Sequence, residues 1–302
     1  MSIITPKRYN TLNCIENCIA NVCDKFAVDF SPLFLFSWDF GYDALQKTIG
    51  ERIHYHHDFD LGLYNYIRIS GDYLNLNFTE RLLNDGICEM HIRPNQIYMI
   101  STDSYDCNWN LAYHKYHYPH YYLLEKSERG AVAVDSFSTL DIQPLNAETL
   151  KAIKNFYCIS HTTANNKNQI IDIQNIYYET INASLDRNIF GGIQNFASDL
   201  STIKDITALS PQISDVSNAY IVRRLSYIAN SRYNTSLLFR YLNFDLEFIN
   251  AIENIFSLWE SIKGLFIKIL ISRNVKNIDK VCQLIVRVAD EEMWLASNLL
   301  RG

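Results

Sequence analysis

The chain has 302 residues, of which 48% are hydrophobic and 20% charged, and its formal net charge is −6. This hydrophobic share is enough to bury a full core, and the length predicts two domains or one large one. The negative charge and the lack of a run of lysines and arginines argue against nucleic acid as a partner. No uninterrupted apolar stretch reaches membrane-spanning length, and residues 1–10 lack the apolar core of a leader. We therefore expect a soluble cytoplasmic protein with no membrane partner.

The chain contains seven cysteines, an odd number. In a large chain without a leader and without Cys-x-x-Cys pairs, this favours free thiols over a disulfide framework. Three of the cysteines fall within "NCIENCIANVC" at residues 13–23. Such a cluster raises the question of whether one of these thiols is reactive or whether all three are packing residues.

The apolar residues of this stretch recur at intervals of three and four, which predicts an amphipathic helix. Asn13 is a favourable N-cap, and Glu16 three residues later completes a capping-box pattern. This places Cys14 in the first helical turn, where unsatisfied N–H groups and the positive end of the helix dipole stabilise a thiolate. Cys18 and Cys23 lie further along the helix, and we expect them to pack in the core.

The rest of the chain changes character near its middle. Residues 33–110 combine short apolar runs with turn signals, which indicates irregular α+β structure. Next, "HYYLLEKSERGAVAVDSF" predicts a β-hairpin with strands at 120–124 and 131–134 around a polar turn at 126–130. Beyond Pro144 the periodicity is mostly helical. The predicted helices cover residues 150–156, 170–185, 193–209, 219–230, 236–242, 247–272 and 278–300. We therefore expect a domain boundary near residue 145.

The predicted hairpin brings a histidine and an aspartate together. If its turn is centred between residues 127 and 128, His120 lies opposite Asp135, with Cβ atoms roughly 5 Å apart. Asp135 can then fix the tautomer of His120 and stabilise its protonated form. A bulge at Gly130 would shift the pairing by one residue and send the two side chains to opposite faces. Because a nucleophilic cysteine needs a base and a group that orients the base, Cys14, His120 and Asp135 are the candidate catalytic residues.

These residues and motifs resemble known cysteine enzymes. A cysteine that opens an early helix, followed by a strand beginning with His and a partner strand ending in Asp, resembles the papain-like fold of the double-glycine leader peptidases. More closely, "LNCIENCIANVC", "HYYLLE" and "VAVDSF" are similar to the N-terminal domain of the butirosin biosynthesis protein H family. The downstream "RNIFGGIQNFASDL" and "NSRYNTSLLFRYL" are similar in arrangement to the helical C-terminal region of that family, so the resemblance covers most of the chain.

The resemblance implies an α+β chain. Residues 1–145 would form a papain-like cysteine-protease fold, with an N-terminal helix and an antiparallel sheet, and residues 146–302 a helical domain that covers the active site. It implies an acyltransferase that moves an acyl group from the phosphopantetheine thioester of an acyl or peptidyl carrier protein to an amine or diamine. The product would be an amide in nonribosomal peptide or antibiotic biosynthesis, and the chain also resembles an amide-forming relative in closthioamide biosynthesis.

The resemblance also implies residue roles. Carried over by position, Cys14 would be the nucleophile, His120 the general base and then acid, and Asp135 the orienting residue. The enzyme itself would bind no cofactor and no metal, and a homodimer stays open. Three acidic residues near the hairpin, Asp103, Asp106 and Glu125, are candidates for holding a cationic amine, although such charges are more often solvated surface.

One position departs from the papain-like pattern. Papain-like peptidases place a glutamine six residues before the cysteine, where it helps to form the oxyanion hole, and this chain has Arg8 there. Asn10, Asn13 and the backbone N–H of Cys14 are alternative donors. Because losing one oxyanion donor can cost ~10²-fold or more in rate, we expect reaction with an electrophilic thioester rather than with an unactivated peptide bond.

Three other interpretations stay open. A cysteine hydrolase, either peptidase or thioesterase, would use the same triad, and a catalytically inactive binding or immunity protein could keep the fold without the chemistry. The segment "HYHHDFD" at residues 54–60 resembles the zinc motif of metallo-β-lactamases, but Phe59 stands in place of the final histidine, which favours an exposed loop. His114, His117 and His120 are spaced by three, but Pro119 argues against a helix that would align them.

Overall fold

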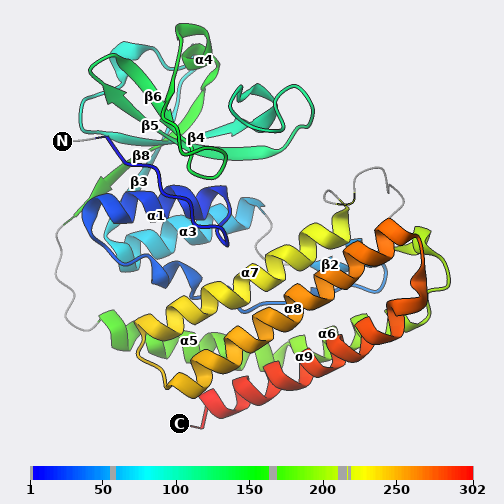
Figure 1. The fold of residues 1–302 in the computed structure, drawn as a ribbon. Helices are drawn as coiled ribbons and strands as arrows, with labels where there is room; N and C mark the ends of the chain where they lie inside the picture. The colour runs from blue at the N-terminus through cyan, green and yellow to red at the C-terminus, as the bar shows by residue number, and fades with distance from the viewer. Residues whose placement is uncertain (1–2, 55–58, 163–168, 210–215, 217–218, 302) are drawn as a thin grey trace. The chain divides into compact units, whose positions relative to one another are not determined.

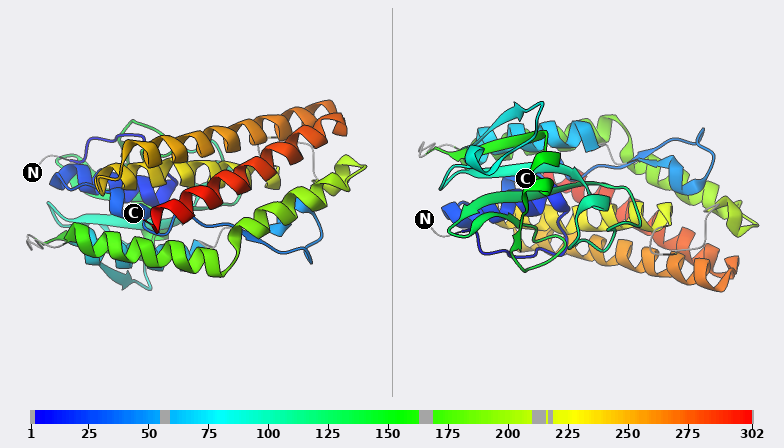
Figure 2. Two further views of the ribbon diagram at one scale, coloured as in Figure 1. Left: turned by 90° about the horizontal axis from the view of Figure 1, so that it is seen from below. Right: turned by 90° about the horizontal axis from the view of Figure 1, so that it is seen from above.

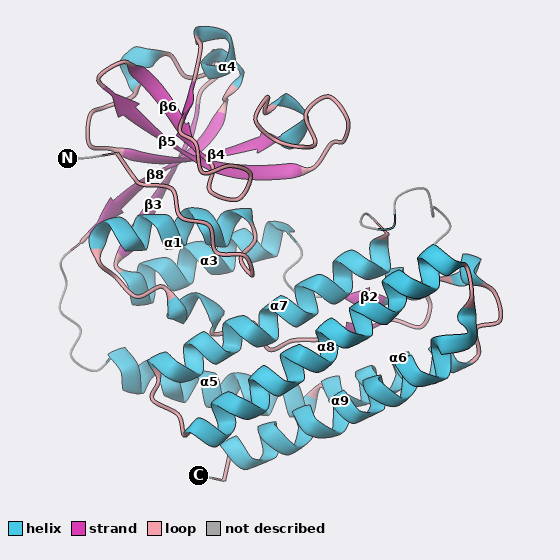
Figure 3. Cartoon of the chain, in the orientation of Figure 1, coloured by secondary structure: helices cyan, strands magenta, loops and turns pink. Residues whose placement is uncertain are grey.

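The computed structural model describes residues 3–54, 59–162, 169–209, 216 and 219–301. The chain divides into two compact units, each made of two segments: unit 1 is residues 1–33 and 63–167, and unit 2 is residues 34–62 and 168–302. The chain thus enters unit 2, returns to unit 1 and enters unit 2 again, whereas the sequence predicted a single boundary near residue 145. The large sheet belongs to unit 1 and the long helices to unit 2. Figure 3 draws the strands in magenta and the helices in cyan.

Unit 1 is built around an antiparallel sheet (Figure 1). In spatial order its strands are β3 (Leu76–Leu82), β8 (Asn155–His161), β4 (Ile97–Asp103), β5 (Pro119–Ser127), β6 (Gly130–Val134) and β7 (Gln143–Pro144). Its helical segments are α1 (Cys14–Phe26), most of α3 (Phe59–Leu74), α4 (Ala147–Ala152) and short 3₁₀ turns at Ser31–Phe34, Glu89–His91 and Ser104–Asp106. The expected helix at 150–156 is wrong beyond Ala152, where α4 ends, because β8 begins at residue 155 and pairs with both β3 and β4.

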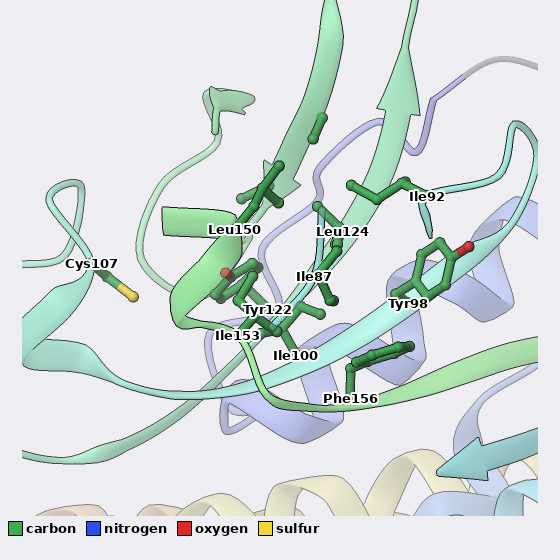
Figure 4. Packing of buried hydrophobic residues seen from close by; sticks show 12 residues of the cluster. Ile87, Ile92, Tyr98, Ile100, Cys107, Tyr122, Leu124, Leu150, Ile153 and Phe156 are labelled. Carbon is green, nitrogen blue, oxygen red and sulfur yellow. The ribbon is translucent and has the colours of Figure 1, made fainter. Parts of the chain in front are cut away.

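One face of this sheet carries a hydrophobic core, seen from close by in Figure 4. Side chains in a strand point to opposite faces in turn, so alternate residues of neighbouring strands meet on one face. Ile100 of β4 pairs with Tyr122 of β5 on one side and with Phe156 of β8 on the other. Leu150 and Ile153, in α4 and directly after it, complete this cluster.

The other face of the sheet receives α1. Glu125 follows Leu124 in β5 and therefore points away from the core cluster, where Lys25 of α1 forms an ion pair with it. The two side chains are only 4% and 12% exposed, respectively. The amide of Ile4 donates to Glu125 Oε2 at 2.7 Å. Glu125 thus joins the N-terminal segment and α1 to the sheet, and this internal role differs from the amine-binding role suggested by the sequence.

Unit 2 consists mainly of long helices. These are α5 (Gln169–Asp186), α6 (Ile189–Ser201), α7 (Tyr220–Tyr241), α8 (Leu246–Ser272) and α9 (Ile278–Leu299), with 3₁₀ turns at Ile206–Ala208 and Val275–Asn277. Helix α8 packs against α7 and α9, and α9 also packs against α6. Figures 1 and 2 show α8 and α9 running side by side in every view. The helices expected at 170–185, 247–272 and 278–300 are confirmed. The one expected at 193–209 is wrong beyond Ser201, where α6 ends, and those expected at 219–230 and 236–242 form the single helix α7.

Residues 34–62 join these helices through a small hairpin of β1 (Gly41–Tyr42) and β2 (Ile53–His54), with α2 (Ile49–Arg52) before β2. The side chain that anchors the segment is Trp38, whose Nε1 donates to Glu292 Oε2 of α9 at 2.8 Å. Arg232 of α7 donates from Nε and Nη2 to the two oxygens of Glu292 at 2.9 Å each. Trp259 Nε1 supplies a further donor at 2.9 Å, so each oxygen accepts from a guanidinium and an indole.

None of the helices within the described ranges combines the length and the apolar character that crossing a membrane requires.

Candidate active site

The first turn of α1 is held by the capping box that the sequence predicted. Asn13 is the N-cap, and its Oδ1 accepts from the amide of Glu16 at 2.9 Å while Glu16 Oε2 accepts from the amide of Asn13 at 2.8 Å. Glu16 Oε1 also accepts from the hydroxyl of Tyr66 at 2.6 Å. Cys14 is therefore the first residue of the helix, at its positive end, as expected.

Two asparagines on α1 hold the N-terminal segment alongside the helix. Asn17 Nδ2 donates to the carbonyls of Tyr9, Leu12 and Asn13, and its Oδ1 accepts from the amide of Tyr9. Asn21, one turn later, bonds both the amide and the carbonyl of Lys7. The spacing of four residues puts both side chains on one face of α1. The repeated asparagines in the cysteine-rich stretch thus fix the chain that leads into Cys14.

The hairpin forms, but its register differs from the prediction by two residues. Leu123 pairs with Val134 and Ser127 with Gly130, so the turn is centred one residue later than expected. The hydroxyl of Ser127 closes it by accepting from the amide of Arg129 at 3.1 Å and donating to the carbonyl of Gly130 at 2.8 Å. Gly130 has a φ of 121°, which other residues rarely adopt. No bulge shifts the pairing by one residue.

The shift leaves the predicted contact intact. Because an even shift keeps each side chain on the same face, His120 and Asp135 become diagonal neighbours instead of directly opposed ones. His120 Nε2 lies 2.7 Å from Asp135 Oδ2. The two side chains are almost fully buried, at 4% and 1% exposed. The structure therefore brings His120 and Asp135 together by a pairing other than the predicted one.

Asp135 has further partners that the sequence analysis missed. Trp109 Nε1 donates to the same Oδ2 at 2.8 Å, and the amide of Ser138 donates to Oδ1 at 3.1 Å. Burial would raise the pKa of Asp135, but the hydrogen bonds from His120, Trp109 and Ser138 and the charge of His120 together lower it. Asp135 is thus held as a carboxylate. The sequence signals for these partners were a tryptophan in the loop before β5 and a serine three residues after the aspartate.

His120 also interacts with Cys14. Burial would lower the pKa of His120, but hydrogen bonds from its ring to Asp135 and to Cys14, together with their charges, raise it to about 10. Cys14 is 5% exposed. The sequence-predicted trio of Cys14, His120 and Asp135 therefore meets in one place within unit 1.

The other two cysteines of α1, Cys18 and Cys23, are buried thiols. Burial raises the pKa of Cys18 well above its ordinary value, with additional contributions from Cys14 and Asp135. Burial also raises the pKa of Cys23, which is fully enclosed. Both thiols therefore stay protonated in the core, which agrees with the expectation that they are packing residues.

Arg8, six residues before Cys14, contacts the loop that follows Asp135. Its Nε donates to the carbonyl of Ser136 at 3.0 Å, and its Nη2 donates to the carbonyl of Phe137 at 2.6 Å. Of the proposed oxyanion donors, Asn13 uses its Oδ1 in the cap and its Nδ2 lies 3.3 Å from Tyr66 Oη. The amide of Cys14 is among the first in the helix, which have no acceptor within the helix.

Other predicted residues lie outside this arrangement. His114 and His117 are in an irregular loop before β5, as expected, and His117 Nδ1 lies 2.8 Å from Asp103 Oδ2. Asp103 thus has a partner of its own, and Asp106 ends a short 3₁₀ turn. The core of the zinc-like motif, residues 55–58, lies outside the described residues, and among the described ones no group of metal-ligating side chains is found.

Neither the known protein-family models nor the curated proteins include a match to this sequence. The chemistry of the site must therefore be inferred from its own geometry.

Proposed function

We propose that unit 1 is a papain-like catalytic unit and that the protein is a cysteine-dependent acyltransferase. It would take an acyl group from the phosphopantetheine thioester of a carrier protein and form an amide with an amine, in nonribosomal peptide or antibiotic biosynthesis. The observation that carries the proposal is the series from Cys14 through His120 to Asp135, in which Asp135 Oδ2 lies 2.7 Å from His120 Nε2 and Cys14 helps to raise the pKa of the His120 ring. Such a series is what an activated thiol nucleophile requires.

The charges of the site support thiolate chemistry. Despite its burial, the hydrogen bond and charge of Asp135, together with Cys14, raise the pKa of His120, which favours the protonated ring. An imidazolium beside a thiol, together with the positive end of α1, stabilises the thiolate, which is the nucleophilic form of cysteine. Asp135 holds the ring in place and balances its charge.

The reaction would proceed in two steps. The sulfur of Cys14 attacks the thioester carbonyl and forms a new C–S bond, and the C–S bond to phosphopantetheine breaks while His120 gives its proton to the leaving thiol. The amine then attacks the acyl-enzyme, His120 takes a proton from its nitrogen, and the C–S bond to Cys14 breaks as the amide forms. The first step exchanges one thioester for another, and the second yields a more stable amide. The amide of Cys14 is the candidate donor to the oxyanion.

The contacts of Arg8 favour thioester substrates over peptides. Its Nε and Nη2 are used by the carbonyls of Ser136 and Phe137, so Arg8 differs in role from the glutamine it replaces. With a weaker oxyanion hole, an electrophilic thioester is a more suitable substrate than an unactivated amide.

The proposal can be tested with acyl thioesters of N-acetylcysteamine, which carry the thiol end of phosphopantetheine. Incubation with a panel of acyl chains should raise the intact mass of the wild-type protein by one acyl group. The adduct should vanish in Cys14→Ala and persist in Cys88→Ser, a control for the partly exposed thiol whose Sγ lies 3.4 Å from His91 Nδ1.

The second step separates the alternatives. Adding a diamine should remove the adduct and yield an amide product. Release of the free acid alone would favour a cysteine hydrolase. An absent adduct across the panel, with Cys14 still alkylated rapidly by iodoacetamide, would contradict acyl transfer, and slow alkylation of Cys14 would favour an inactive binding protein.

A further inference from the structure

We propose that Arg8 is a positioning residue that holds the loop after Asp135 so that His120 keeps the orientation in which it serves Cys14, a role that rests on the proposed function. The residue stands where papain-like peptidases carry an oxyanion donor, but its contacts give it another task. It acts through Asp135 and His120 and contacts neither the sulfur nor the imidazole in the bonds described.

Arg8 donates hydrogen bonds to the backbone carbonyls of two successive residues. Its Nε donates to the carbonyl of Ser136 at 3.0 Å and its Nη2 to the carbonyl of Phe137 at 2.6 Å. A guanidinium presents its donors in a rigid planar fork, and hydrogen bonds from a charged donor are stronger than neutral ones. Holding both carbonyls fixes the direction in which the chain leaves Asp135.

The loop held by Arg8 contacts both His120 and its partner carboxylate. The ring of Phe137 lies 6.0 Å from the ring of His120, tilted by 48°. The amide of Ser138 donates to Asp135 Oδ1, and its hydroxyl lies 3.4 Å from His120 Nε2. Any movement of residues 136–138 therefore changes the surroundings of His120 directly.

The segment that contains Arg8 also connects this loop to α1, the helix that begins with Cys14. The neighbours of Arg8 in the chain, Lys7 and Tyr9, are bonded through their backbone to Asn21 and Asn17 of α1. Asn21 Nδ2 additionally donates to Ser136 Oγ at 2.9 Å. Residues 7–9 are thus hydrogen-bonded both to α1, which begins with Cys14, and to the loop that follows Asp135. Within this segment, Arg8 makes the contacts to the loop through its charged side chain.

The exposure of Arg8 makes the proposal testable without unfolding the protein. Arg8 is an exposed residue, so replacing it leaves no cavity in the core. The test compares Arg8→Met, which removes the donors but keeps a long side chain, with Arg8→Lys, which keeps the charge but not the fork. Lys7→Ala is the matched control, because the ammonium of Lys7 is directed to Asp24 at 3.7 Å.

The first readout is the rate at which iodoacetamide alkylates Cys14 at pH 7, followed by peptide mapping in a Cys88→Ser background. We expect Arg8→Met to lower this rate about 10-fold or more, because small displacements of a catalytic group can cost up to ~10²-fold. Arg8→Lys should retain an intermediate rate, and Lys7→Ala should match the parent.

The second readout is the titration of the His120 ring by NMR, assigned with His120→Gln. Asp135 and Cys14 are the charged groups that raise its pKa, so loosening the loop should move the titration midpoint down by at least about one pH unit. Lys7→Ala should leave the midpoint unchanged.

The outcomes separate the two proposals. If wild-type Cys14 reacts no faster than a thiol of the unfolded chain, the proposed function fails. If wild-type Cys14 is fast and Arg8→Met is equally fast with an unchanged His120 titration, only the role of Arg8 is overturned. A lower unfolding midpoint with both readouts unchanged would likewise overturn it and leave Arg8 a purely structural contact.

Discussion

At the scale of single residues, the site is governed by the balance between burial and charge. Burial alone would favour the neutral forms of His120 and Asp135. Each supplies the opposite charge that favours the ionised form of the other. Trp109 and Ser138 add neutral donors to the carboxylate. The pair is therefore stable as an ion pair inside the protein only while both members are present.

This balance predicts how stability depends on pH. The pKa of His120 rises from 6.5 to about 10 on folding. Between these values the folded protein keeps a proton that the unfolded chain has released, so the contribution of His120 to the free energy of unfolding is complete below pH 6.5 and falls as the pH rises toward about 10. Urea unfolding of wild type and His120→Gln should therefore show a stability difference that shrinks over this range. A difference independent of pH would contradict the ion pair.

The contribution of Asp135 to the free energy of unfolding depends on pH in the opposite direction. Its pKa is lowered from 3.8, so its contribution to the free energy of unfolding is present above this value and is lost as the pH falls below it.

At the scale of elements, α1 and the hairpin show which local patterns are strong. The capping box forms as predicted because Asn13 and Glu16 satisfy each other within a single turn. The hairpin register is shifted because Ser127 and Gly130 close a turn one residue later than expected. Alternation of side chains was the more reliable pattern, and it kept His120 and Asp135 on one face.

The asparagine contacts of α1 lead to a stability prediction. Asn17 is buried and bonds the carbonyls of Leu12 and Tyr9 as well as the amide of Tyr9. Asn17→Ala leaves these groups without their partner and should lower the free energy of unfolding by about 2 to 3 kcal/mol. Chemical denaturation measures this change.

The control for Asn17→Ala is Asn10→Ala, because Asn10 is exposed in the same segment. That substitution should change the free energy of unfolding by less than about 0.5 kcal/mol. Equal effects of the two substitutions would mean that the side chain of Asn17 does not hold the segment in place.

At the scale of the whole molecule, the chain enters unit 2 twice, and the first entry is anchored by buried polar contacts. Trp38 in residues 34–62 donates to Glu292, which is also paired with Arg232. Ser37 Oγ lies 2.8 Å from Thr235 Oγ1 of α7. A segment far from α7 and α9 in sequence thus completes the interior of unit 2.

These contacts predict a large effect of breaking the buried ion pair. Glu292→Ala leaves the fully buried Arg232 without a counter-charge and removes the acceptor of both Trp38 and Trp259. The substitution should therefore lower the free energy of unfolding by about 3 to 5 kcal/mol. Denaturant unfolding followed by tryptophan fluorescence measures the loss.

The neighbouring Glu291 offers a matched control on the same helix. It pairs with Arg287 at the surface, where the side chains of Glu291 and Arg287 are 28% and 58% exposed. Glu291→Ala should therefore lower the free energy of unfolding by less than about 1 kcal/mol. A similar cost for both substitutions would contradict a special role for the buried pair.

The amino-acid sequence alone determined the start of α1, the helical nature of most of the second half, and the identity of the candidate trio. The first two features depend on capping and periodicity, which act between residues a few positions apart, whereas the trio was inferred from the cap, the predicted hairpin and the resemblance. The sequence indicated which residue types could form the site, but it did not indicate how unit 1 assembles around them.

Tertiary structure alone decided the hairpin register, the insertion of β8 between β3 and β4, the double entry into unit 2, and the partners of Arg8 and Asp135. Arg8 and Ser136 are separated by 128 positions. No local pattern encodes such a contact, because it exists only once the sheet has placed the loop after Asp135 beside the segment that precedes Cys14.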